Sequence, residues 1–231
     1  MDVLLDFRTE VAPNADPDQH SPTLREYHRR LWSKDLPNGK PFPLSTEQKH
    51  HYLHHQSDLG QFSLASDVIG RSFAHVKQMS NVLCKVPEEF QENALKTIYT
   101  IGGFTVFPGN RINGKMTING ARGFNQRIFD RFDLTLKCIK LFYEGKENPL
   151  ADAFERYRDF FMLFLDFRGY VDFFLLQDLI NKDGEVNFFL PFDATFPTRP
   201  YPRTEDEYYR YTENELTFIA ARRERMLALG L

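Results

Sequence analysis

The chain has 231 residues, of which 42% are hydrophobic and 26% are charged, and its net charge is -3. This length suits one large domain, which can bury a core without a disulfide or a structural metal. The near-neutral charge excludes a general electrostatic attraction to nucleic acid or to anionic membranes, although a local basic patch is compatible with it.

Two cysteines, Cys84 and Cys138, stand far apart, which excludes a disulfide scaffold and a cysteine-based zinc cluster. They fit the reducing cytosol. No secretory signal is predicted at the N-terminus, and no uninterrupted apolar run is long enough to span a bilayer. We therefore expect a soluble cytoplasmic protein with no membrane segment and a single globular domain over residues 1–231.

The first third of the chain predicts short strands and helices. Residues 3–7 form an apolar run typical of an edge strand. Residues 21–32 predict a helix with serine at the N-cap and proline at the first helical position. Residues 62–69 indicate a strand. Residues 87–96 indicate a helix that starts with proline and has two glutamates in its first turn, where negative charge is favourable.

The stretch from Tyr99 to Tyr143 organises the rest of the chain. Residues 98–107 are rich in Thr, Val, Ile, Phe and Tyr and predict a strand, in which Gly102 and Gly103 indicate a bulge or the close approach of another backbone. After a turn, residues 115–118 can return as a second strand.

A long helix is predicted next, capped by Asn119 and ended by Gly145. Apolar residues spaced by three and four predict the face that it turns to the core. These are Ala121, Phe124, Ile128, Phe132, Thr135, Ile139 and Phe142.

The second half is mainly helical. Residues 148–165 and 170–181 predict two apolar helices, residues 186–190 a buried strand, and residues 204–227 a helix that starts with a capping box. Most of the 23 phenylalanines fall in this half and predict an aromatic core. The fold class is therefore α+β, with a small antiparallel sheet in the first half packed on a helical second half.

The candidate site is the corner where the predicted strands lead into the long helix. Free amides at a helix N-terminus together with arginine side chains favour an anion. The residues are Asn110, Arg111, Asn119, Arg122 and Asn125. We expect Arg111 and Arg122 to converge on one phosphate or carboxylate. The structural alternative is that Arg127, Asp130, Arg131 and Asp133 form intrahelical ion pairs on a solvated face.

Other polar clusters carry weaker signals. If residues 50–55 are helical, His50 with His54 and His51 with His55 share faces suited to a metal, but no zinc-protease motif is present, and no metal site is assigned. Four aspartates lie among aromatic residues and favour helix caps or arginine pairs: Asp159, Asp166, Asp172 and Asp178. No nucleophile motif, P-loop or dinucleotide fingerprint occurs, so no catalytic residue and no cofactor are identified.

Several sequence blocks resemble an uncharacterised bacterial family of unknown function, and together they cover nearly the whole chain. They include Phe107-Pro108-Gly109-Asn110-Arg111, Thr117-Ile118-Asn119, Ala121-Arg122-Gly123, Asp130-Arg131-Phe132-Asp133-Leu134-Thr135-Leu136 and the segment 166–178. The resemblance implies a single bacterial, cytoplasmic domain and assigns no catalytic residue.

Three functions stay open at this point. The preferred one is a binding or regulatory domain for a small anionic or nucleotide-like ligand. The second is a hydrolase or transferase that acts on a phosphorylated substrate through Asp130 or Asp133. The third is a protein-interaction module that uses exposed aromatic residues. Those aromatic residues are Phe192, Phe196, Tyr201, Tyr208 and Tyr209.

Overall fold

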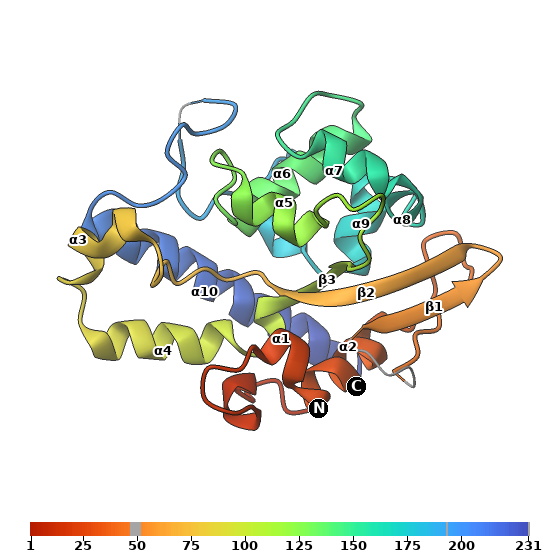
Figure 1. Ribbon diagram of the computed structural model, residues 1–231, viewed down its shortest axis with the longest axis horizontal. Helices are drawn as coiled ribbons and strands as arrows, with labels where there is room; N and C mark the ends of the chain where they lie inside the picture. Colours follow the sequence, from red (N-terminus) through yellow and green to blue (C-terminus); the bar gives the residue numbers. More distant parts are fainter. Residues whose placement is uncertain (47–51, 193, 231) are drawn as a thin grey trace.

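The sheet of the computed structural model has three antiparallel strands in the order β1-β2-β3 (Figure 1). The residues that the structure describes are 1–46, 52–192 and 194–230. The strands are β1 (Leu53–Ser57), β2 (Gly60–Val68) and β3 (Phe104–Pro108). β1 and β2 form a hairpin, and β2 pairs with β3 from Leu64 opposite Pro108 to Val68 opposite Phe104.

The N-terminal segment forms helices and no strand in its described residues. They are η1 (Phe7–Glu10), α1 (Pro17–His20) and α2 (Pro22–Trp32). The strand predicted over residues 3–7 is wrong, because Asp6 accepts the Arg8 N–H and starts a 3₁₀ turn. The predicted start of α2 is confirmed, since Ser21 accepts the Leu24 N–H at 3.0 Å.

Short helices connect β2 to β3: η2 (Lys77–Met79), α3 (Ser80–Leu83), α4 (Glu88–Ile98) and η3 (Ile101–Gly103). The strand predicted over residues 98–107 begins only at Phe104, because α4 and η3 take up the preceding residues. The close approach at the glycines is confirmed. A Cβ on Gly103 would collide with the Ile98 carbonyl oxygen, and one on Gly102 would lie 2.5 Å from the Ile219 carbonyl oxygen.

The long helix predicted from Asn119 is two helices, α5 (Ile118–Phe124) and α6 (Phe132–Tyr143). Phe129 and Asp130 between them have φ of 52° and 61°, and this left-handed conformation interrupts a right-handed helix. Asn119 is not the cap: Thr117 Oγ1 accepts the Gly120 N–H at 3.3 Å. The return strand predicted over residues 115–118 is wrong, because β2 takes the place beside β3.

The second half contains α7 (Ala151–Arg156), α8 (Arg158–Met162), α9 (Phe167–Phe173), η4 (Gln177–Leu179) and α10 (Glu205–Ala228). The helix predicted over residues 148–165 is divided at Tyr157 into α7 and α8. The helix predicted over residues 170–181 begins earlier, at Phe167, and ends at Phe173, after which Leu175 has a left-handed conformation. Of the strand predicted over residues 186–190, only a single bridge between Ile180 and Val186 is present. The capping box of α10 is confirmed.

The predicted aromatic core is formed by residues of α8, α9 and the segments that follow these helices. Phe160, Phe161, Phe164, Tyr170 and Phe174 are buried and make ring contacts with one another. Figure 1 shows α5 to α9 on one side of β3 and α1 and α2 on the other, so all five residues of β3 are buried. The α+β fold predicted from the sequence is thereby confirmed.

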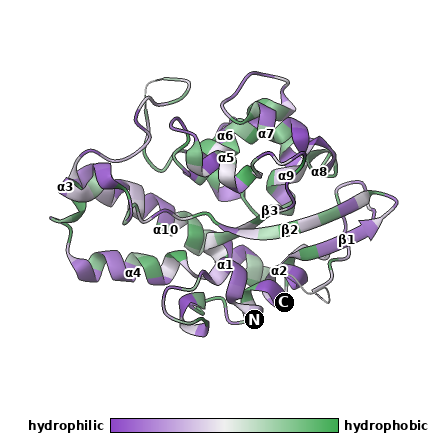
Figure 2. Ribbon diagram, viewed as in Figure 1, coloured by the Kyte–Doolittle hydropathy of each residue, from purple (hydrophilic) through white to green (hydrophobic). Residues whose placement is uncertain are grey.

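The C-terminal helix α10 joins β3 to the helical second half through Arg222. Hydrophilic and hydrophobic residues are interspersed along it, as along α4 (Figure 2). Arg222 is fully buried and donates hydrogen bonds to the carbonyl oxygens of Gly102, Phe104 and Phe174. Within residues 1–46, 52–192 and 194–230, no helix is both long and apolar enough to cross a membrane.

Candidate functional site

The five predicted site residues lie around α5 and divide between its two sides. Asn110 and Arg111 follow β3 and are exposed, and Asn125 follows α5 and lines an open pocket. Asn119 is partly buried and Arg122 is fully buried, and both contact β2. The structure thus separates an outer group (Asn110, Arg111 and Asn125) from an inner group (Asn119 and Arg122).

Arg122 belongs to the inner group and is surrounded by partners. Its guanidinium forms an ion pair with Asp67 of β2, and Nη2 lies 3.6 Å from the carboxylate of Asp130. Nε donates to Thr135 Oγ1 at 3.2 Å, and Nη2 donates to the Asp130 carbonyl oxygen at 3.1 Å. Because two carboxylates compensate its charge, Arg122 anchors α5 to the sheet.

The asparagine side chains mainly bind backbone groups. Asn119 donates to the Ser66 carbonyl oxygen at 3.4 Å, while its Oδ1 is buried with no hydrogen-bond partner among the described residues. Asn125 donates to the Pro149 carbonyl oxygen at 3.0 Å and accepts the Arg127 N–H at 2.9 Å. These contacts fix the two ends of α5.

Arg111 lies at the surface on the side of Tyr157. Burial raises the pKa of Tyr157, and the charges of Arg156 and Arg111 reduce that rise. The Tyr157 hydroxyl donates to the Asn110 carbonyl oxygen at 2.8 Å, which holds the loop after β3 against α7. The convergence of Arg111 and Arg122 on one anion stays a prediction. Arg122 would have to exchange its internal carboxylates for that anion.

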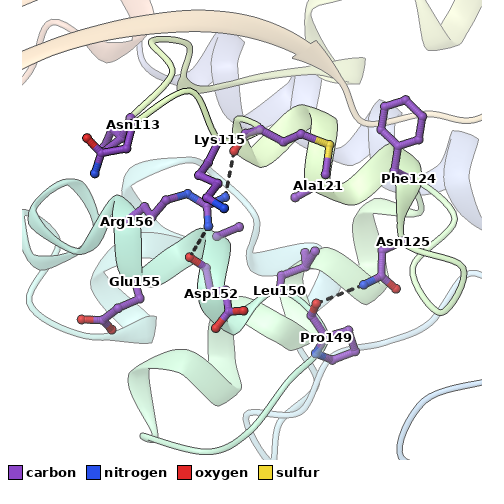
Figure 3. A pocket seen from close by; sticks show the side chains of 13 residues that line it. Asn113, Lys115, Ala121, Phe124, Asn125, Pro149, Leu150, Asp152, Glu155 and Arg156 are labelled. Atoms are coloured by element: carbon purple, nitrogen blue, oxygen red, sulfur yellow. Dashed lines mark hydrogen bonds between the residues drawn. The ribbon is translucent and has the colours of Figure 1, made fainter.

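An open pocket of about 880 Å³ lies between α5, α7 and the loop that precedes α5 (Figure 3). Its apolar lining is Ile112, Met116, Ala121, Phe124, Pro149, Leu150 and Ala153. Its polar lining is Asn113, Lys115, Asn125, Asp152, Glu155 and Arg156. In the view of Figure 3, Phe124 stands at one end of the pocket, and Lys115 and Arg156 lie between it and Asn113.

Apolar side chains are unusually exposed at this pocket. Phe124 is 76% exposed and Met116 is 47% exposed. The prediction that Phe124 faces the core is wrong, because α5 ends at this residue and the periodicity of the long helix is lost there. An exposed ring beside a hollow is typical of a binding surface.

Arg156 holds the two walls of the pocket together. Nη1 donates to the Asp152 carbonyl oxygen at 2.7 Å, and Nη2 donates to the Met116 carbonyl oxygen at 2.8 Å. Its Nε is buried and has no hydrogen-bond partner in the described part of the chain. Arg156 therefore fixes the loop that carries Lys115 and keeps one donor unused.

A chain of hydrogen bonds lies on the inner side, beneath Asn119. The Trp32 indole N–H donates to His28 Nδ1 at 3.0 Å, so the proton of the neutral imidazole is on Nε2, which lies 3.0 Å from Ser66 Oγ. Ser66 in turn donates to Asp18 at 3.3 Å. Burial and the charge of Arg222 lower the pKa of His28 to about 3, so His28 does not act as a base toward Ser66.

Two acidic side chains have raised pKa values, Asp18 at the end of these hydrogen bonds and Glu215 beside Arg71. Burial, assisted by the charge of Asp16, raises the pKa of Asp18 to about 7. Burial raises the pKa of Glu215 on α10 to about 8. Raised pKa values of this kind occur at functional sites and also in structural networks. Neither residue can be predicted from the sequence, because an isolated acidic residue gives no signal of burial.

Arg131 and Asp133 form a buried pair, and the prediction that they lie on a solvated face is wrong. Arg131 Nη2 lies 2.5 Å from Asp133 Oδ2, and Asp133 also accepts the Phe189 N–H at 2.8 Å. Asp130 instead pairs with Arg71 at 2.6 Å and is partly exposed. Of the two aspartates proposed for catalysis, Asp133 is therefore occupied by structural contacts and Asp130 borders the solvent.

Comparison with known proteins gives one relationship. Residues 1–226 match a family described as a family of unknown function (DUF6994). The chain belongs to this family. No curated protein and no solved structure matches it. The match spans both sides of α5 and both groups of site residues.

In this family member, the described histidines of the predicted pairs, His54 and His55, lie on a strand and not on a helix. His50 and His51 are outside the described residues, and His54 and His55 lie in β1, where neighbouring side chains point to opposite faces. His55 is buried between the Pro43 carbonyl oxygen and the Ser57 hydroxyl. No group of three potential metal ligands occurs in the described residues.

Three members of the aspartate set have structural partners. Asp166 caps α9 by accepting the Gly169 N–H at 2.8 Å. Asp172 lies 3.3 Å from Arg168, and Asp178 lies 2.6 Å from Arg225. These contacts agree with the helix caps and arginine pairs that the sequence favours.

The aromatic residues of the C-terminal region are turned inward. Phe196 and Tyr208 are buried, and Phe192, Tyr201 and Tyr209 pack against the core. The prediction that they form an exposed patch is therefore wrong. The exposed aromatic ring on α5 is at the outer pocket instead.

Proposed function

We propose that the protein binds a small anion of nucleotide size in the pocket between α5 and α7. The observation that carries this proposal is an apolar hollow with an exposed phenylalanine, Phe124, and two cationic side chains, Lys115 and Arg156, in its lining. A flat ring of the ligand stacks on Phe124, and its phosphate or carboxylate meets Lys115.

The pocket has the size that such a ligand requires. Pockets for small molecules usually measure about 300–1,000 Å³, and this one measures about 880 Å³. Asp152 and Glu155 also line it, so the pocket is not uniformly positive. Their carboxylates suit hydroxyl or amino groups on the same ligand, which favours a nucleotide over a simple inorganic anion.

The predicted corner contributes to this site in two ways. Asn125 lines the pocket, and Arg111 is carried by the loop that leads into it. Asn119 and Arg122 act from behind by fixing α5 on β2. On this proposal Arg122 supports the pocket wall, and Arg111 approaches the anion from the surface.

A thermal-shift titration with adenosine monophosphate, adenosine and inorganic phosphate tests the proposal. Binding to the folded state alone raises the stability with ligand concentration. The nucleotide should raise the melting temperature more than adenosine or phosphate does at equal concentration.

Two variants and two controls locate the binding. Phe124→Ala and Lys115→Ala should each weaken nucleotide binding about tenfold, because one stacking or charged contact is worth about 1.4 kcal/mol or more. Leu4→Ala and Lys96→Ala remove a comparably exposed apolar or basic side chain elsewhere and should leave it unchanged. A titration that is flat, or equal in all five proteins, overturns the proposal.

A further inference from the structure

A second cavity lies beside Arg71 and Asp130. It measures about 220 Å³ and lies between the segment after β2, the end of α4 and the turn before α6. Its lining includes the apolar residues Val68, Leu95 and Ile98 and the polar residues Arg71, His75 and Asp130. The cavity thus combines apolar and charged surfaces, and it is too small for a nucleotide.

The charged residues of the lining form an ion pair. Arg71 Nη1 lies 2.6 Å from Asp130 Oδ2, and the two side chains are partly exposed. Arg71 Nε is buried and has no hydrogen-bond partner among the residues that the structure describes. The rings of Phe73 and Phe129 lie 5.7 and 5.2 Å from the guanidinium carbon and cover part of its surface. Arg71 thus has an N–H group without an acceptor within the described ranges, and the neighbouring aromatic rings strengthen electrostatic contacts by lowering the local polarity.

The backbone holds both charges in position. The Arg71 N–H donates to Glu215 at 2.8 Å, and the Asp130 N–H donates to the Arg122 carbonyl oxygen at 3.2 Å. Asp130, Phe129 and Phe73 have φ between 52° and 61°, which is unfavourable for residues other than glycine. Phe73 and Asp130 line the cavity and Phe129 precedes Asp130, so tertiary contacts impose the local geometry of all three residues.

We propose that this cavity binds a small zwitterion of the α-amino acid type with an apolar side chain. An anion that binds Arg71 would also lie next to the negative charge of Asp130. A cation that binds Asp130 would likewise lie next to the positive charge of Arg71. A zwitterion satisfies both, since its carboxylate accepts from the Arg71 guanidinium and its ammonium group donates to Asp130. Its side chain lies against Val68, Leu95 and Ile98. The volume limits the ligand to a small amino acid.

Isothermal titration calorimetry with L-valine tests the proposal. Isovalerate and isobutylamine serve as probes, because each is L-valine without one of its two charged groups. L-valine should bind at least tenfold more tightly than either probe. The variants Arg71→Gln and Asp130→Asn should each weaken L-valine binding at least tenfold. Asparagine tolerates the left-handed conformation of residue 130, so that variant is expected to fold.

The control is a second ion pair of similar geometry. Arg225 and Asp178 lie 2.6 Å apart on the surface, and Arg225→Gln and Asp178→Asn should leave L-valine binding unchanged. Binding of isovalerate as tight as that of L-valine, unchanged in Asp130→Asn, would show a plain anion site and overturn the proposal. The absence of heat with L-valine at millimolar concentration overturns it as well. Phe124→Ala, which tests the outer pocket, should not affect this binding.

Discussion

Replacement of Glu215 by glutamine should remove a large part of the pH dependence of stability. Glu215 is fully buried on α10, and its Oε1 accepts the Arg71 N–H at 2.8 Å. Its Oε2 is buried with no hydrogen-bond partner in the described part of the chain. Burial raises the pKa of this carboxyl to about 8, although the Arg71 N–H, Tyr211 and the charge of Arg131 favour ionisation.

The magnitude follows from the two pKa values. The ordinary pKa of the group is 4.5, so between pH 4.5 and about 8 the folded chain holds a proton that the unfolded chain has lost. The stabilisation from this proton is complete below pH 4.5 and is lost as the pH rises through about 8. Since one pKa unit corresponds to about 1.4 kcal/mol, the loss over the window is about 5 kcal/mol.

Urea denaturation at pH 5, 6, 7 and 8 measures this effect. Glutamine keeps the oxygen that accepts the Arg71 N–H and is neutral at every pH, so Glu215→Gln should gain about 1.4 kcal/mol per pH unit over the wild type. Asp18, whose pKa burial raises to about 7, titrates in both proteins and cancels in the difference. Glu213→Gln changes an exposed glutamate of the same helix and serves as the control for the chemical change itself.

A constant free-energy difference between wild type and Glu215→Gln across this range would refute the reasoning. It would mean that the carboxyl has the same pKa in the folded and unfolded chains. Burial without a partner for Oε2 would then not govern its ionisation.

Further substitutions test the contacts around α5 and the core, each by urea denaturation. Arg122→Ala should destabilise the protein by about 3–5 kcal/mol, because it leaves a carboxylate of β2 without its partner, whereas Arg111→Ala at the surface should change stability by less than about 0.5 kcal/mol. Phe160→Ala should cost about 3–5 kcal/mol in the aromatic core, and Phe124→Ala should be neutral within about 0.5 kcal/mol. Asp166→Ala should cost about 1 kcal/mol, since it removes the cap of α9. Equal losses of stability for the buried and the exposed residues would contradict the assigned contacts.

Features encoded within a few neighbouring residues could be predicted from the sequence. Ser21 and Thr204 cap α2 and α10 as expected, because a capping residue and the amides that it satisfies are local in the chain. The close approach at Gly102 and Gly103 also follows from residue type. The aromatic core follows from composition, since phenylalanine in such numbers cannot remain in water.

Features that depend on distant contacts could not be predicted. The break between α5 and α6 has no proline, and the left-handed Asp130 is held by hydrogen bonds to Arg122. Asp67 and Arg71 gave no signal of their role, because a charged residue in a sequence is expected at the surface. Their partners are 55 and 59 residues away in the chain, so only the folded structure brings them together.

The short helix α5 depends on a distant contact, and this explains why the predicted corner divides into two sides. α5 has only seven residues, and two of them are glycines, so its intrinsic helix propensity is low. The ion pair of Arg122 with Asp67 supplies the stability that the helix lacks, and it does so from the buried side. The opposite side of α5 is then free to present Phe124 to the outer pocket without contributing to the core. Arg122 also contacts Asp130, so one buried side chain positions a wall of each pocket.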